Sequence, residues 1–157
     1  MEHILCLASQ GLSIFECHIT SVYAPKSQVE TRLVWEELAD VRRLMDGPWA
    51  ICGDFNVCKF PSEKRDCSKR NSAMREFSDC IEDMDLVDPQ LGSESYTWYK
   101  GDNHTTASRI DRILVSIEWN NLFNILKQTT FAKSDFRSCP YSSILWALGA
   151  IEILFQV

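Results

Sequence analysis

The sequence predicts a mixed α/β domain, and three observations support this class. Short runs rich in β-branched and aromatic residues alternate with two longer segments whose apolar residues recur every three or four positions. The length of 157 residues is enough for one domain with a buried core. The composition, 45% hydrophobic and 24% charged, is typical of a folded chain and argues against disorder.

The net charge limits the partners of this chain. The 16 Lys and Arg residues and 22 Asp and Glu residues give a formal charge of −6. Overall attraction therefore cannot hold the chain on nucleic acid, and any such contact needs a local site. No apolar run approaches the about 20 residues of a membrane-spanning helix, and Met1-Glu2-His3 lacks the basic start of a secretory signal. We expect an intracellular chain, nuclear or cytoplasmic, without membrane contact, and no protein partner is indicated.

The cysteines favour reduced thiols over a disulfide framework. Their number is odd, and no pair has the C-x-x-C spacing. A zinc site built from Cys52, Cys58 and Cys67 is the alternative, but the closely spaced chelating pairs of such sites are missing. Buried thiols that pack as small hydrophobic side chains are therefore the favoured interpretation. The seven positions are Cys6, Cys17, Cys52, Cys58, Cys67, Cys80 and Cys139.

The first elements are predicted to be a hairpin and a helix. Residues 4–8 and 12–24 read as strands joined by a turn at residues 9–11. Ser27 and Glu30 have capping-box spacing, in which each side chain bonds the other residue's backbone N–H at a helix start. Gly47 and Pro48 follow in the order that ends a helix. The expected buried face of this helix consists of Val34, Leu38, Val41 and Met45.

A buried strand and a second helix come next. The apolar residues 49–52 predict a strand covered on both faces, which runs into Gly-Asp-Phe-Asn at 53–56. The charged residues 59–69 are expected to form an exposed loop. Asn71 marks the start of the second helix. Its predicted core stripe consists of Met74, Phe77, Ile81 and Met84.

The last predictable elements are a second hairpin and a short helical turn. Residues 96–99 and 108–115 read as paired strands joined by a turn at 100–103. Ser116 is expected to cap a short helical turn that holds Trp119, Leu122 and Phe123.

Three carboxylates, Asp54, Asp111 and Asp135, are candidate site residues, and structural roles are the alternative for Asp54 and Asp111. Asp54 follows the buried strand, so it is a turn residue or a site residue. Asp111 lies in an apolar run, where a charge needs an ion pair, here with Arg109 or Arg112, or a metal. Asp135 follows Ser134 near the end. Convergence of these carboxylates on one cleft would create a Mg²⁺ site, because Mg²⁺ prefers oxygen ligands.

The order of several motifs resembles the endonuclease/exonuclease/phosphatase family, which includes the DNase-I-like nucleases. The details are most similar to the endonuclease domain of plant LINE-type retrotransposons. The resemblance is collinear over residues 3–135. The motifs are VYAP (22–25), GPW (47–49), GDFN (53–56), MREFSDCI (74–81), YTW (96–98) and SRIDRILVS (108–116) with Trp119.

This resemblance implies a partial DNase-I-like four-layer α/β sandwich and a Mg²⁺-dependent site that cleaves phosphodiester bonds in DNA. Asp54 and Asn56 would activate and orient the attacking water. Tyr23 would contact the scissile phosphate, Asp111 would orient a catalytic His, and Asp135 would serve the metal. As a separate hypothesis from the residues themselves, Trp98 and Arg109 would supply stacking and phosphate contacts to nucleic acid, with packing in the core as the alternative for the aromatic side chains.

The sequence departs from the family pattern at two places. The family's terminal S-D-H motif reads Ser134-Asp135-Phe136 here, and a phenyl ring cannot carry a proton. The family's first strands, with an Asn and a metal-binding Glu, have no counterpart, because Glu2, Glu16 and Glu30 stand in other contexts. We therefore expect a truncated domain over residues 1–136, an apolar tail over 137–157, and little or no turnover. The alternatives are a noncatalytic nucleic-acid-binding remnant and a retroelement fragment without function.

Overall fold

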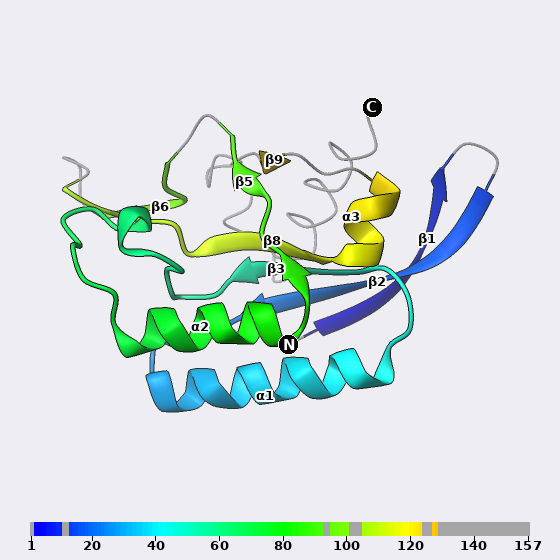
Figure 1. Cartoon of the computed structure of the whole chain (residues 1–157), viewed down its shortest axis with the longest axis horizontal. Coiled ribbons are helices and arrows are strands. Elements are labelled where there is room, and N and C mark those ends of the chain that lie inside the picture. The colour runs from blue at the N-terminus through cyan, green and yellow to red at the C-terminus, as the bar shows by residue number, and fades with distance from the viewer. Residues whose placement is uncertain (1, 11–12, 93–94, 101–104, 124–126, 129–157) are drawn as a thin grey trace.

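Strands and helices alternate along the chain, which confirms the predicted α/β class (Figure 1). The structure is a computed structural model that describes residues 2–10, 13–92, 95–100, 105–123 and 127–128. Within these residues, no helix is long and apolar enough to cross a membrane. Asp135 and the expected tail over residues 137–157 lie outside them, so the two-part division of the chain stays a prediction.

A five-stranded mixed sheet forms the centre of the domain. The first two strands form the predicted antiparallel hairpin, the second and third run parallel, and the remaining pairs are antiparallel. In spatial order the strands are β1 (Glu2–Gln10), β2 (Ser13–Tyr23), β3 (Trp49–Asp54), β8 (Asp111–Ser116) and β4 (Leu86–Val87).

Two long helices, α1 (Gln28–Leu44) and α2 (Ser72–Asp83), lie side by side along one face of this sheet (Figure 1). Between sheet and helices lies an apolar core that contains the aromatic rings of Trp35, Phe55 and Phe77. Their centroids are 5.1 to 6.0 Å apart. The smaller elements are η1 (Pro61–Glu63), α3 (Ile117–Phe123), the pair β6 (Trp98–Lys100) and β7 (Thr106–Ser108), and the pair β5 (Gln90–Leu91) and β9 (Lys127–Gln128).

Helix α1 forms where predicted, but its first turn is stabilised differently. The capping-box prediction is wrong, because the Ser27 side chain makes no capping hydrogen bond. The Thr31 hydroxyl instead donates to the carbonyl oxygens of Ser27 (2.8 Å) and Pro25 (2.9 Å). Trp35 and Leu38 are the buried residues of the helix, while the rest of the predicted stripe packs half-buried at the edge of the core.

Helix α2 confirms its prediction closely. The Asn71 side chain accepts a hydrogen bond from the Met74 N–H at 2.9 Å, which satisfies one of the free donors at the helix start. All four residues of the predicted stripe are buried, and Phe77 is completely so. The strong periodicity of this segment reflects one apolar face pressed on the sheet.

The predicted return strand over residues 108–115 is divided in two. β7 ends at Ser108 and pairs with β6, whereas β8 begins at Asp111 and joins the central sheet. Thr97 stabilises the break between β7 and β8, because its hydroxyl oxygen accepts hydrogen bonds from both Ile110 N and Asp111 N at 3.0 Å. Periodicity could not reveal the break, since the apolar pattern continues across it.

Ser116 caps α3 as predicted and has a second role. Its hydroxyl oxygen accepts hydrogen bonds from Trp119 N (3.2 Å) and from Trp49 N at the start of β3 (3.1 Å). The Trp49 indole N–H donates in turn to the Thr20 hydroxyl at 2.8 Å. One buried serine therefore joins β8, β3 and α3.

Replacing Ser116 tests this junction. Ser116→Ala removes the acceptor of two backbone N–H groups, so we expect the free energy of unfolding to fall by about 2 kcal/mol or more. The exposed Ser62→Ala should change it by less than about 0.5 kcal/mol. Urea unfolding followed by tryptophan fluorescence measures both. Equal stability of Ser116→Ala and the unchanged chain would contradict the assignment.

Candidate phosphodiester site at one end of the central sheet

Three of the predicted site residues form a row across adjacent strands. The parallel pairing of β2 and β3 places Tyr23 beside Asp54. The antiparallel pairing of β3 and β8 places Asp111 on the other side of Asp54. The carboxyl ends of β2 and β3 therefore meet the first residue of β8 at one end of the sheet, which is a typical location for ligand sites in α/β folds.

Gly53 allows the strands to come this close. Its backbone has φ of +143°, and an added Cβ would stand 1.9 Å from the carbonyl oxygen of Val22. No side chain fits there. Beyond this point the strands stay in register, with Ala24 N donating to Asp54 O and Phe55 N donating to Ile110 O. The glycine thus fixes the separation between Tyr23 and Asp54.

The turn after β3 orients Asp54 and Asn56. One Asp54 carboxylate oxygen, Oδ1, accepts a hydrogen bond from Asn56 N at 2.8 Å. The Asn56 side-chain amide donates to the carbonyl oxygen of Ala24 at 2.6 Å. Asn56 has φ of +51°, a left-handed conformation that Asn tolerates better than most residues. Asp54 is therefore a turn residue as well as a member of the row.

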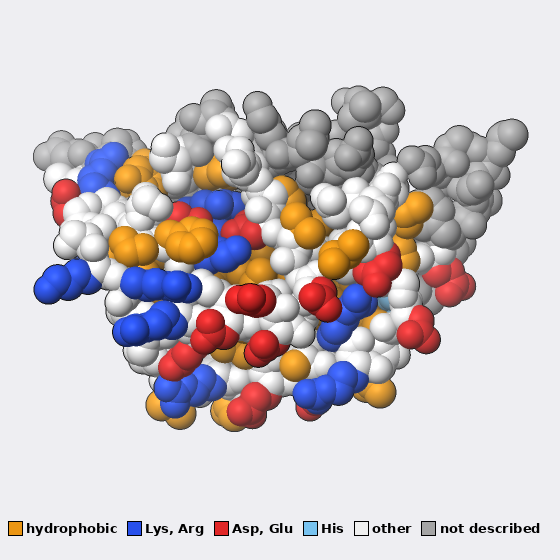
Figure 2. Space-filling view, viewed as in Figure 1, with side chains coloured by type: hydrophobic (Ala, Val, Ile, Leu, Met, Phe, Trp, Pro, Cys, Tyr) orange, Lys and Arg blue, Asp and Glu red, His pale blue; other side chains and the backbone are white. Residues whose placement is uncertain are grey.

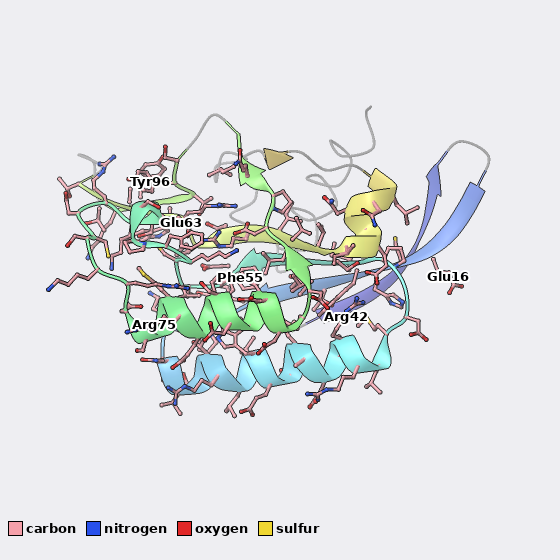
Figure 3. The ribbon with its side chains drawn as sticks, in the orientation of Figure 1. Glu16, Arg42, Phe55, Glu63, Arg75 and Tyr96 are labelled. Atoms are coloured by element: carbon pink, nitrogen blue, oxygen red, sulfur yellow. The ribbon has the colours of Figure 1, made fainter. Side chains whose placement is uncertain are left out.

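Phe55 and Tyr23, which lie next to these polar groups, differ in their exposure to solvent. Phe55 is fully buried against Trp35 and Phe77, so the turn cannot shift without disturbing the core (Figure 3). Tyr23, by contrast, is 74% exposed. A phenol held at a strand end and open to solvent can donate a hydrogen bond to a ligand oxygen.

A buried cluster of four charged side chains includes the two arginines that lie on either side of Asp111 in the sequence. Arg109 donates to Glu63 (3.2 Å) and to Asp88 (2.8 Å). Arg112 donates to the same two carboxylates, at 2.7 Å for Asp88. The side chain of Arg112 is fully buried, and the exposed fractions of the other three are 6 to 11%. This quartet, Glu63, Asp88, Arg109 and Arg112, brackets Asp111 in the chain.

The electrostatics of the quartet are balanced by direct contacts. Burial would raise the pKa of Glu63, but hydrogen bonds and charge from Arg112, with the N–H groups of Lys59 and Phe60, outweigh it and lower this pKa. Burial and the charge of Arg112 lower the pKa of Arg109, as expected for adjacent guanidiniums. Arg109 still stays protonated, because the guanidinium group does not lose its proton in proteins.

The quartet changes two expectations from the sequence. Residues 59–69 are largely an exposed loop as predicted, but Glu63 is an exception that turns inward (Figure 3). Arg109, predicted to contact nucleic acid, lies in this cluster with its guanidinium held by two carboxylates. Trp98 is half-buried in β6, and its contact with nucleic acid stays a prediction. The available sequence signal was that Arg109 and Arg112 stand in and next to the apolar run over residues 110–115, where a charge needs a buried carboxylate partner.

The described residues do not form a metal site by themselves. Among them, no group of three or more His, Cys, Asp or Glu side chains could hold a metal ion. Asp135, the predicted Mg²⁺ ligand, lies outside the described residues. Burial raises the pKa of the Cys52 thiol to about 12 and also raises that of Cys58, so neither favours the thiolate that zinc requires.

Comparison with known proteins identifies a matching family and similar folds. A sequence model of the endonuclease/exonuclease/phosphatase family matches residues 10–123. The fold is similar to the endonuclease domain of TRAS1, a telomere-specific non-LTR retrotransposon, with 12% identity and a TM-score of 0.56 over 76% of this chain and 52% of that chain. It is also similar to a beta hairpin deletion mutant of beta toxin from Staphylococcus aureus, with 13% identity and a TM-score of 0.54 over 84% of this chain and 49% of that chain.

These likenesses confirm the predicted fold. At 12% and 13% identity they establish the arrangement of the chain and not its activity. The chain spans about half the length of both structures, 52% and 49%.

The close approach at Gly53 can be tested against a second glycine. Gly53→Ala combines backbone strain with a steric clash, so we expect a loss of about 3 kcal/mol in the free energy of unfolding. Gly47 also has a positive φ, of +99°, but nothing lies within 4 Å of its added Cβ. Gly47→Ala should therefore cost only about 1 kcal/mol. Equal losses in thermal or urea unfolding would show that the contact with Val22 is unimportant.

The quartet predicts an acid-sensitive stability. Because the folded protein lowers the pKa of Glu63, the stabilisation by this carboxylate is complete above its ordinary value of 4.5 and is lost as the pH falls through the lower folded value. Glu63→Gln should cost about 3 kcal/mol at pH 7 and flatten the decline in stability below pH 4.5.

Glu76 supplies the matched control for this experiment. Its carboxylate pairs with Arg32 at the surface, and that hydrogen bond lowers its pKa in the same direction. Because water screens this pair, Glu76→Gln should change stability much less. Urea unfolding at a series of pH values compares the two variants. A larger loss for Glu76→Gln would overturn the importance of the buried cluster.

Proposed function

This chain belongs to the endonuclease/exonuclease/phosphatase family, and on that premise we propose that the row of Tyr23, Asp54 and Asp111, with Asn56, is a phosphodiester site of the DNA-endonuclease type with little or no turnover. The observation that carries the proposal is the register of β2, β3 and β8, which gathers residues separated by as many as 88 positions at one end of the sheet.

The chemistry of such a site follows from the groups that are gathered. Hydrolysis needs a water oxygen to attack phosphorus while its proton leaves, as the bond between phosphorus and the leaving oxygen breaks. Asp54 can accept the water proton at a carboxylate oxygen, and Asn56 beside it can orient the water or the phosphate. The exposed Tyr23 hydroxyl can donate to a phosphate oxygen.

The low turnover rests on residue 136. Family members carry a His after the Ser-Asp pair, where this chain has Phe136. A phenyl ring can neither transfer a proton to the leaving oxygen nor stabilise developing negative charge. A positioned general acid or base typically contributes a factor of about 100 to 10,000 in rate. In the family pattern Asp111 would orient that His, and Phe136 cannot take the role of the His.

Magnesium and evolutionary origin belong to the same proposal. When bound, Mg²⁺ would neutralise charge on the phosphate. Asp135 would be one of its ligands, since no group of three or more His, Cys, Asp or Glu among the described residues could hold the ion. A retroelement origin, of the plant LINE type, is supported by the ordered motifs and by the fold shared with a retrotransposon endonuclease domain.

A noncatalytic nucleic-acid-binding role is the second candidate. It is favoured by a group of exposed cations between residues 64 and 75, close in the chain to the site. Such a chain would hold DNA without cutting it. A DNA partner and an intracellular, nuclear or cytoplasmic location remain parts of this proposal.

A plasmid-nicking assay tests the proposed activity. Purified chain incubated with supercoiled plasmid and Mg²⁺ should nick no faster than Asp54→Ala, because proton transfer at the leaving oxygen is missing. Asp46→Ala, which removes an exposed carboxylate at the far end of α1, controls for the charge change. Nicking by the unchanged chain and by Asp46→Ala that disappears in Asp54→Ala would establish an active enzyme and overturn the low turnover.

A further inference from the structure

Positive charge is concentrated in one segment of this acidic chain. Residues 64–75 contain five cationic side chains and a single carboxylate, Asp66. All five are exposed, and the first turn of α2 within this segment has no acidic residue. We call this group the basic strip; it consists of Lys64, Arg65, Lys69, Arg70 and Arg75.

Four of the five cations of the strip form no internal ion pair with a carboxylate of the described residues. Within the described part of the chain, Lys64, Lys69, Arg70 and Arg75 form no salt bridge with a carboxylate. Glu63, the nearest carboxylate before the strip, is turned inward by the quartet. Figure 2 shows Lys and Arg side chains gathered at the left of the view, while carboxylates lie mainly at its centre and right.

Aromatic rings hold two of these cations in place. The Arg70 guanidinium lies over the half-exposed ring of Phe60 at 5.9 Å from its centroid, and that of Arg65 lies over Tyr96 at 5.5 Å. Such cation–π contacts attract the guanidinium to the face of the ring and so restrict the conformations of the side chain. A cation that is already ordered loses less conformational entropy when it binds an anion.

The fold fixes the strip at the same end of the molecule as the candidate site. Arg65 N donates to Ala107 O in β7 at 2.9 Å, and the backbone of Lys64 forms an isolated antiparallel β-bridge with Ser108. Asp111 follows three residues after Ser108. The arrowheads of β2 and β3 point toward the end where α2 begins, and the labelled Arg75 and Tyr96 lie at that end (Figures 1 and 3).

We propose that the basic strip binds the phosphate backbone of a DNA duplex whose neighbouring phosphate reaches the row of Tyr23 and Asp54. This inference rests on the proposed function and assigns a docking surface to it. A row of exposed cations, of which Lys64, Lys69, Arg70 and Arg75 form no salt bridge within the described residues, fits a regularly spaced polyanion better than a single small anion. The contacts are to phosphates, so the strip positions DNA without reading its sequence.

Binding of a short fluorescein-labelled DNA duplex, followed by anisotropy over a range of salt concentrations, tests the proposal. Arg70→Ala/Arg75→Ala should weaken binding about tenfold or more at low salt and reduce the salt slope by about two, one for each lost phosphate contact. Arg70→Lys/Arg75→Lys keeps the charges and should keep the slope. Both residues are exposed, so unfolding midpoints should not change.

The matched control removes the same charge elsewhere. Arg32→Ala/Arg43→Ala takes two exposed cations from α1, where each pairs with a carboxylate, and should leave the salt slope unchanged. Equal weakening by both double variants would reduce the effect to net charge and overturn the strip. An unchanged chain that does not bind at low salt would overturn it as well, as would tighter binding of an RNA duplex of the same length.

The binding and nicking assays separate the two proposals. Asp54→Asn should bind the duplex at least as well as the unchanged chain, because the strip is intact and one negative charge is gone. Loss of binding in Asp54→Asn would show that the site and not the strip holds DNA. Asp54-dependent nicking with an intact strip would overturn only the low turnover.

Discussion

The buried quartet of Glu63, Asp88, Arg109 and Arg112 is the constraint on which the functional end of this domain depends. Each charge taken out of water carries a large desolvation cost, which only close pairing repays. Each arginine pairs with both carboxylates, and the Arg112 guanidinium also lies 5.5 Å from the centroid of the Phe77 ring. Because the partners come from η1, the end of β4 and the start of β8, their pairing fixes these three segments together.

This pairing has consequences for both sides of the site. Arg109 N also donates to Glu63 O at 2.8 Å, so the break between β7 and β8 is tied to the loop that follows the Gly-Asp-Phe-Asn turn. Asp111 begins β8 immediately after this break and meets Asp54. On the outer side, the inward turn of Glu63 removes a carboxylate from the surface where the basic strip lies. The same contact thus supports the row and leaves the strip positive.

The geometry of the row explains why particular residue types are needed at positions 53, 55 and 56. Tyr23 and Asp54 stand side by side only because Gly53 lets the backbone of β3 approach Val22. Asn56 can take its left-handed turn and still reach Ala24 with its amide. Phe55 between them is buried against the core. The polar residues at the sheet end are therefore positioned by the apolar packing of Phe55.

Local patterns in the sequence determined much of this fold. The stripe of α2 and its start at Asn71, the hairpin of β1 and β2 and the strand before Asp54 follow from hydrophobic periodicity and turn residues. The cap at Ser116 follows from a hydrogen bond that reaches three residues along the chain. These features agree with the structure because each depends on neighbours in the chain.

The tertiary structure alone decided what distant residues do. Glu63 and Asp88 lie 46 and 21 positions from Arg109, and nothing in their local sequence marks them as its partners. The break at Arg109 and Ile110 between β7 and β8 needs the Thr97 hydroxyl, which comes from the residue before β6. The strip is positive because Glu63 is buried, although composition shows only mixed charges. Periodicity reports which face of an element is buried, whereas the choice of ion-pair and hydrogen-bond partners depends on which elements the topology brings together.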